Sequence, residues 1–239
     1  MTNRPLILHF TGVYTSENLP EDTGGTVLDC RDLDGTNCYC DPTTEAELAA
    51  RLAACPLRTV HWIDSGDYHY VTKLLTDRMT EPFDLVVADH HPDMQPPAFG
   101  EILSCGGWVR SALETNPILR DVWLVGINPD LRGECGGFGN RVHIIDRTEP
   151  LDPSAVAPGR NVYLSIDKDV LCPAEARTDW DQGTMTAETL LDLVRALGPR
   201  LAGADICGAL PASKGGKDAD FSVNRTLNRR LDKLFSLYL

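Results

Sequence analysis

The sequence lacks the features that mark several large classes of protein. It contains no uninterrupted apolar run of about 18 residues, so we expect no transmembrane helix. Basic residues are scarce, with 22 Lys and Arg against 35 Asp and Glu, and the formal net charge is −13. Nucleic acids and anionic membranes bind cationic surfaces, so we expect neither of them as a partner.

The sequence also lacks a metal-binding or disulfide-forming pattern of cysteines. No C-x-x-C pair is present, and no spacing completes a zinc knuckle. Residues 1–10 carry a short apolar run without a small-residue cleavage signature, so we expect no signal peptide. These absences favour a cytoplasmic protein whose cysteines are free thiols that pack as small hydrophobic side chains. The cysteines are Cys30, Cys38, Cys40, Cys55, Cys105, Cys135, Cys172 and Cys207.

What is present is typical of one folded domain. The hydrophobic fraction of 42% and the charged fraction of 24% are ordinary for a globular protein, which argues against disorder. A chain of 239 residues is long enough for an α/β domain with a sizeable core, and no repeat or linker divides it. We therefore expect a single catalytic domain over residues 1–239.

Hydrophobic patterning predicts strands that alternate with helices. Such alternation is typical of a three-layer α/β/α fold whose central sheet is mostly parallel, here with about eight strands. The expected strands are Leu6–Phe10, Val27–Leu28, Thr59–Ile63, Phe83–Ala88, Val122–Ile127, Val142–Ile145, Val162–Ile166 and Ala202–Ile206. The expected helices begin at Thr43 or Thr44, Val71, Trp108, Thr186 and Asn224. Loops are expected over Thr11–Thr26, Arg31–Pro42, Gln95–Gly107, Asn128–Asn140, the Pro-rich stretch before Arg160, and Asp167–Gly183.

The strongest chemical signal follows the strand Phe83–Ala88. Two carboxylates and two imidazoles stand there within five residues, Asp89-His90-His91-Pro92-Asp93. In an extended segment, Asp89, His91 and Asp93 point the same way, because side chains alternate with period two. Carboxylates with one or two imidazoles suit Mn, Mg, Fe or Zn, so we interpret this segment as half of a metal site.

Two further strands end in acidic residues. Asp167 and Asp169 follow Val162–Ile166 and are again two residues apart. Asp64, Asp67 and His69 follow the strand Thr59–Ile63. Ligands bind at the carboxyl ends of strands in open α/β sheets, so we expect these groups to meet there. Four carboxylates would balance two divalent cations.

These motifs carry a family resemblance. Asp89-His90-His91-Pro92-Asp93 resembles the D-x-H-x-D element of the arginase/agmatinase (ureohydrolase) family, and Ser165-Ile166-Asp167-Lys168-Asp169 resembles its S-x-D-x-D element. Ser65-Gly66-Asp67-Tyr68-His69 is similar to its G-G-D-H element with one extra residue. Asp205–Pro211 resembles its last-strand motif, and Asn224-Arg225-Thr226 its final helix. The match runs in order from about Thr59 to the C-terminus.

The resemblance implies two Mn²⁺ ions per chain and a residue for each role. Asp89 and Asp167 would bridge the ions and hold a shared hydroxide, which would attack the substrate carbon. His69 and Asp93 would complete one position, and His91 and Asp169 the other. Because of the extra residue, Asp67 and Tyr68 compete with His69 for its ligand position. His90 is a further catalytic candidate, with packing beside the ligands as the alternative.

The sequence departs from the family pattern at two positions, one that binds the substrate and one that transfers a proton. Alignment through Asp205 and Pro211 places Gly208 where the family has a guanidinium-binding glutamate. A proton-shuttle histidine is also absent from the segment Ser104–Trp108. A guanidinium cation still needs a carboxylate partner. The sequence offers loop carboxylates that could take this role: Glu134, Asp179, Asp181 and Asp218.

We therefore predict a manganese-dependent hydrolase of non-peptide C–N bonds in a small guanidino-type substrate, in a chain that could form homo-oligomers. An arginase-fold deacylase with a single zinc is one alternative. A non-catalytic metal-binding member of the family is another, and a structural protein without metal is the third. Retention of all six candidate ligands favours the catalytic interpretation, because a metal site that has lost its catalytic function usually loses ligands.

Overall fold

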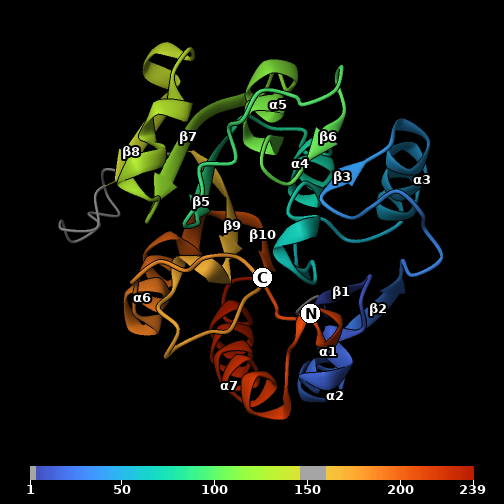
Figure 1. Cartoon of the computed structure of the whole chain (residues 1–239). Coiled ribbons are helices and arrows are strands. Elements are labelled where there is room, and N and C mark those ends of the chain that lie inside the picture. The colour runs from blue at the N-terminus through green and yellow to red at the C-terminus, as the bar shows by residue number, and fades with distance from the viewer. Residues whose placement is uncertain (1–3, 146–159) are drawn as a thin grey trace.

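A computed structural model describes residues 4–145 and 160–239 (Figure 1). Its centre is an eight-stranded sheet in the order β2-β1-β4-β10-β9-β5-β7-β8, and each described pairing within it is parallel. These strands are β1 (Leu6–His9), β2 (Thr26–Asp29), β4 (Val60–Trp62), β5 (Phe83–Ala88), β7 (Leu119–Val125), β8 (Val142–Ile145), β9 (Asn161–Asp167) and β10 (Leu201–Cys207). The predicted fold class and strand number are confirmed.

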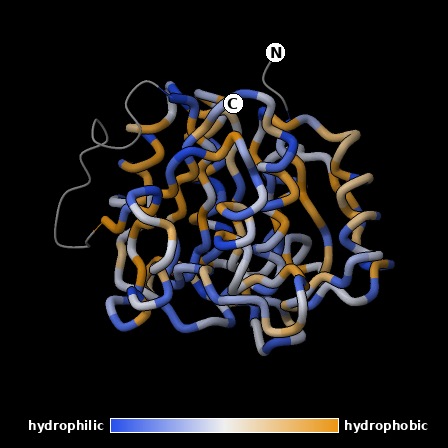
Figure 2. The backbone as a smooth tube through the Cα atoms, turned by 90° about the horizontal axis from the view of Figure 1, so that it is seen from above, coloured by the Kyte–Doolittle hydropathy of each residue, from blue (hydrophilic) through white to orange (hydrophobic). Residues whose placement is uncertain are grey.

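Helices cover both faces of the sheet. They are α1 (Val13–Ser16), α2 (Leu19–Thr23), α3 (Pro42–Ala53), α4 (Val71–Thr76), α5 (Trp108–Thr115), α6 (Ala187–Leu197) and α7 (Asp218–Phe235). One hydrophobic core joins the sheet to α1, α2, α6 and α7, and the other joins it to α3, α4 and α5. In Figure 2, apolar segments run through the interior, whereas the outer loops are largely hydrophilic.

Strand β5 shows why this arrangement needs two helical layers. All six of its residues are buried, and its apolar side chains are divided between the two cores. Val86 and Ala88 pack into the first core, while Leu85 and Val87 pack into the second. A strand that is apolar on both faces is stable only when helices cover both faces. The polar residues of the site therefore lie beyond the carboxyl end of β5.

Several local expectations were wrong. The segment Thr11–Thr26, expected as a loop, contains α1 and α2. Asp41, and not Thr43 or Thr44, caps α3, because its Oδ1 accepts hydrogen bonds from both threonine N–H groups at 3.0 and 3.2 Å. The last helix begins at Asp218, six residues before the expected start at Asn224.

Two of the expected loops pair with each other. Strands β3 (Tyr39–Cys40) and β6 (Leu103–Ser104) form a small antiparallel sheet between the segments Arg31–Pro42 and Gln95–Gly107. Most of the expected Pro-rich loop lies in 146–159, outside the described residues. Within the described part of the chain, no helix has both the length and the apolar character needed to cross a membrane.

Candidate metal centre

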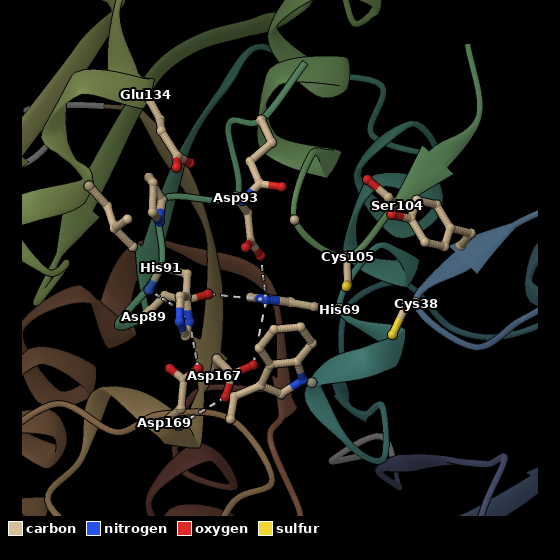
Figure 3. Close-up of a pocket in the computed structure, with 17 residues that line it drawn as sticks. Cys38, His69, Asp89, His91, Asp93, Ser104, Cys105, Glu134, Asp167 and Asp169 are labelled. Atoms are coloured by element: carbon tan, nitrogen blue, oxygen red, sulfur yellow. Dashed lines mark hydrogen bonds and ion pairs between the residues drawn. The ribbon is translucent and has the colours of Figure 1, made fainter. Parts of the chain in front are cut away.

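The predicted ligands converge at the carboxyl edge of the sheet. Asp89 follows β5, Asp167 ends β9, and His69 follows the short 3-10 helix η1 (Gly66–Tyr68) after β4. Strands β4, β10, β9 and β5 are consecutive in the sheet, so segments that are distant in sequence meet there. Figure 3 shows their side chains pointing toward one another at the floor of a pocket.

The first cluster surrounds the His69 ring. Its Nδ1 atom lies 3.0 Å from Asp93 Oδ2, 3.2 Å from Asp89 Oδ2 and 3.7 Å from Asp167 Oδ2. All four residues are buried. The competing candidates point elsewhere: Asp67 pairs with Lys214 at 2.6 Å, and the Tyr68 ring stacks on Phe10. The structure therefore places His69, and neither Asp67 nor Tyr68, against the carboxylates.

The second cluster surrounds His91. Its Nδ1 atom lies 2.9 Å from Asp169 Oδ2 and 3.6 Å from Asp89 Oδ1. Asp89 thus faces His69 with one oxygen and His91 with the other. Asp167 faces only the first cluster, because its Oδ1 accepts the N–H of Asp169 at 2.9 Å. The geometry makes Asp89 the carboxylate common to both clusters.

The charge of the two clusters fits divalent cations. Their four carboxylates are buried, and no described Lys or Arg forms an ion pair with any of them. Burial and the Asp89 charge raise the pKa of Asp93 to about 7, and burial also raises the pKa of Asp167 and Asp169. Such a group of acids must hold protons or cations, and its oxygen and imidazole donors suit manganese.

Residues that are not candidate ligands fix the orientation of His69 and Asp93 through hydrogen bonds. His69 Nε2 contacts Ser165 Oγ at 2.8 Å, and that hydroxyl donates to Asp205 Oδ1 at 2.7 Å. With Nε2 as the donor, Nδ1 keeps its lone pair for the acidic cluster. The Trp108 indole N–H donates to Asp93 Oδ2 at 2.6 Å. Trp108 is fully buried, and its indole supports a candidate ligand from behind.

A buried charge pair lies behind the segment Asp167–Asp169. Lys168 is fully buried, with Nζ 3.6 Å from Glu17 Oε2 and 5.5 Å from the centre of the Tyr14 ring. Lys168 is thus held in a buried ion pair and is not exposed to solvent. Its direction away from the pocket leaves Asp167 and Asp169 to face the clusters.

His90 lies outside the pocket wall. Its side chain is buried, and Nε2 lies 3.6 Å from Asp181 Oδ2. The ring meets the His91 ring edge-on, with centres 5.3 Å apart. This position beside a candidate ligand matches the packing alternative, and a catalytic role for His90 stays a prediction.

A cavity of about 260 Å³ opens above the clusters. One loop carboxylate from the sequence candidates lines it, Glu134, which lies on the 3-10 helix η2 (Pro129–Cys135). Asp179 pairs instead with Lys214 at 2.9 Å, and Asp181 with His91 Nε2 at 3.1 Å. Of the other wall residues, Gly66 and Pro92 belong to the motifs quoted from the sequence, and Trp180 could be suspected as a loop aromatic. The rest were missed by sequence reasoning, since they come from loops without a distinctive pattern. They are Cys38, Tyr39, Gln95, Ser104, Cys105, Gly106 and Leu131.

Gly208 has a structural reason to be glycine. Its φ is +83°, and a Cβ there would stand 2.2 Å from Asp167 Oδ1 and 2.7 Å from the Lys168 nitrogen. A glutamate could not occupy this backbone position without displacing a candidate ligand. Any carboxylate that meets a substrate cation would therefore have to come from another part of the chain.

The comparisons with known proteins agree with this architecture. A sequence model of the arginase family matches residues 61–226. An uncharacterized protein of Thermotoga maritima is 30% identical over 206 residues, which cover 84% of this chain and 78% of that protein.

Among solved structures, proclavaminate amidino hydrolase from Streptomyces clavuligerus has a TM-score of 0.73 at 15% identity, covering 100% of this chain and 94% of that chain. Formimidoylglutamase from Bacillus subtilis has a TM-score of 0.71 at 13% identity, covering 100% and 88%. Because the sequence identity is so low, these two comparisons show that the fold is shared and nothing beyond the fold.

Proposed function

The chain belongs to the arginase family, and from that premise we propose that it is a dinuclear manganese-dependent hydrolase that cleaves a C–N bond of a guanidino-type substrate. The observation that carries the proposal is the pair of histidine–carboxylate clusters that share Asp89. The helices pack on the two faces of one eight-stranded sheet, which supports a single catalytic domain over residues 1–239. A cytoplasmic location and a homo-oligomeric state are part of the same proposal.

Each candidate ligand has an assigned position. His69 and Asp93 would hold one Mn²⁺, and His91 and Asp169 the other, with Asp89 contributing to both and Asp167 to the first. Two such ions supply Lewis acidity and lower the pKa of a bound water. The Ser165–Asp205 pair keeps His69 oriented through Nε2, so its Nδ1 stays available as a donor.

Glu134 is the proposed partner of the substrate cation. It is half-buried, lines the cavity, and makes no hydrogen bond or ion pair with the described residues. A carboxylate in such a position can accept two charge-assisted hydrogen bonds from a guanidinium group. Its place on a loop would compensate for Gly208, which the backbone keeps free of a side chain.

The walls around the clusters would position the substrate and limit access of water. Trp180 and Gly66 line one side of the cavity, and a Cβ on Gly66 would stand 3.0 Å from the Trp180 ring and from Asp167 Oδ2. Trp180 is held by a hydrogen bond from its Nε1 to Asp67 Oδ1 at 3.1 Å. A planar group could pass this wall only in a restricted orientation, which favours attack at one carbon.

The test is product release by the manganese-loaded protein from a panel of substrates. The panel holds arginine, agmatine, shorter guanidino acids, an arginine-containing peptide and a formimidoyl amino acid, with urea, ammonia and formamide as readouts. We expect one of these products from wild type and none from Asp167→Ala. Two bound metals per chain without any product would contradict the proposed reaction and favour a binding role.

A further inference from the structure

Cys207 stands at the floor of the site, although the ligand assignment does not use it. It is the last residue of β10 and is fully buried. The parallel register of β10 and β9 sets Cys207 directly beside Asp167, and its Sγ lies 3.1 Å from Asp167 Oδ2. The donor atoms of Cys207, His69 and Asp167 all lie within 4.8 Å of one another.

The strand delivers this thiol to the clusters for a simple geometric reason. Side chains two residues apart share one face of a strand, so Cys207 lies on the same face as Asp205. Asp205 supports His69 through Ser165 on that face. Next in sequence is Gly208, whose φ of +83° ends the extended run. The chain therefore presents Cys207 beside the candidate ligands and then turns away.

The two clusters consequently differ in donor chemistry. The Asp89–His91–Asp169 group offers oxygen and nitrogen only, whereas the His69 side also offers sulfur. Thiolate selects soft or borderline cations such as Zn²⁺, while carboxylate and imidazole alone accept Mn²⁺. A thiol that served only as packing would need no contact with a carboxylate oxygen, yet Cys207 has one.

We propose that Cys207 is a sulfur ligand of the cation held by His69 and Asp167, so that this position selects a thiophilic divalent cation such as Zn²⁺ while the His91 position takes Mn²⁺. The inference rests on the proposed function for its two-cation site, and it replaces the Mn²⁺ assigned to the His69 position by the thiophilic cation. On binding, the thiol proton leaves to solvent and a metal–sulfur bond forms, with no change of oxidation state. The pair of metals in the working protein would then be mixed.

The first test uses Co²⁺ alone, added to the metal-free full-length protein. A thiolate bound to Co²⁺ gives a charge-transfer absorption in the near ultraviolet, which oxygen and nitrogen ligands do not give. We expect this absorption in wild type and its loss in Cys207→Ser. Cys105→Ser is the matched control, because Cys105 is another thiol that lines the cavity. It should keep the absorption.

The second test is competition between equimolar Zn²⁺ and Mn²⁺, with bound metals counted by mass spectrometry. Wild type should retain one of each per chain. Cys207→Ser and Cys207→Ala should lose zinc affinity at least about 10-fold, since even loss of groups that only support ligands has that effect. Their manganese affinity should change much less. Circular dichroism of both variants establishes that they are folded.

Each outcome decides the proposal. Two bound cobalt ions without the near-ultraviolet absorption in wild type would overturn the role of Cys207 and leave the two-cation site intact. Equal zinc preference in wild type and a folded Cys207 variant would do the same. If wild type bound no metal ion at all, the ligand role of Cys207 and the proposed function would both fail.

Discussion

At the scale of single residues, position 208 links the backbone to the ligands. Gly208 and Gly215 both have positive φ, at +83° and +96°. They differ in their surroundings, because a Cβ at 215 meets nothing within 4 Å, whereas one at 208 meets Asp167 Oδ1 at 2.2 Å. The two glycines thus separate the cost of an unfavourable φ from the cost of displacing a ligand.

This contrast gives the first prediction. Gly215→Ala should lower the free energy of unfolding by about 1–2 kcal/mol, the cost of a left-handed conformation. Gly208→Ala should lower it further and should also weaken Mn²⁺ binding, because Asp167 must move. Chemical denaturation and manganese titration of both variants check this. Equal manganese affinity in the two variants would count against Asp167 as a ligand.

The second prediction concerns Glu134. Loss of a charge-assisted hydrogen bond costs about 1.5–3 kcal/mol, so Glu134→Gln should lower kcat/KM roughly 10- to 150-fold for the substrate found in the panel. Asp130→Asn is the matched control, since Asp130 lies on the same 3-10 helix without lining the cavity. Steady-state kinetics at equal metal occupancy check this. A similar loss in both variants would point to a disturbed loop instead of a lost substrate contact.

The sequence was most informative about residues in compact motifs at the ends of strands. Asp89, His91 and Asp93 follow β5, and Asp167 and Asp169 stand at the end of β9, so they could be recognised as candidate ligands. The extended geometry assumed for them was wrong, because Asp93 has a φ of +50° and Asp169 lies in a 3-10 helix. Cys207 and Glu134 could not be assigned in the same way. Cys207 lies inside the last-strand motif, but its role depends on Asp167, which stands beside it across β9 and β10. Glu134 was one of four candidate loop carboxylates, and the fold decides which of them lines the cavity.

At the scale of elements, α1 near the N-terminus and α7 near the C-terminus meet behind the segment Asp167–Asp169. Glu17, which follows α1, accepts hydrogen bonds from Asn224 and Asn228 of α7 at 2.8 and 2.6 Å. Lys168 projects between these elements, and Glu17 is its charged partner. This contact ties α1 and α7 to the segment that carries Asp167 and Asp169.

The third prediction tests that contact. Lys168→Met should lower the free energy of unfolding by about 3–5 kcal/mol, because it leaves the buried Glu17 carboxylate without its cation. The double variant Glu17→Gln/Lys168→Met should regain part of this loss, since it removes the unpaired charge. Urea denaturation of the single and double variants measures the coupling. A double variant no more stable than Lys168→Met would mean that the pair carries little energy.

The elements that sequence reasoning missed are short and paired over long range. Strands β3 and β6 have two residues each and lie more than sixty positions apart, so neither has a periodic pattern that a window can detect. Helices α1 and α2 contain four and five residues and were hidden by glycine and proline nearby. The long buried strands β5 and β9 were correctly predicted, because burial on both faces gives continuous apolar runs.

At the scale of the whole molecule, the acidic clusters couple stability to pH and metal. The pKa of Asp93 is raised to about 7 by burial and Asp89. His91 has a pKa raised to about 12 by Asp169 and Asp89, against the effect of burial. Both groups bind protons more strongly in the folded, metal-free protein than in the unfolded chain. The contribution of Asp93 to stability is therefore lost as pH rises from about 4 to about 7, and that of His91 as pH rises above about 6.5.

The fourth prediction follows from this sign. Between pH 6.5 and about 8, the metal-free protein should become less stable, while Mn²⁺ affinity should rise about tenfold per pH unit for each proton displaced. The difference in Tm between samples with excess Mn²⁺ and with chelator should grow over this range. Thermal unfolding at three pH values checks it. A constant difference would show that the metal displaces no protons and would contradict the ligand assignment.

The central claim is that two cations at the carboxyl edge of the sheet hydrolyse the substrate. The most direct measurement is the rate of product release as Mn²⁺ is titrated into the metal-free protein, with bound metal counted in the same samples. The account predicts that activity reaches its plateau at two bound ions per chain, and that His91→Ala stays inactive with one. Full activity with one ion or none would contradict it.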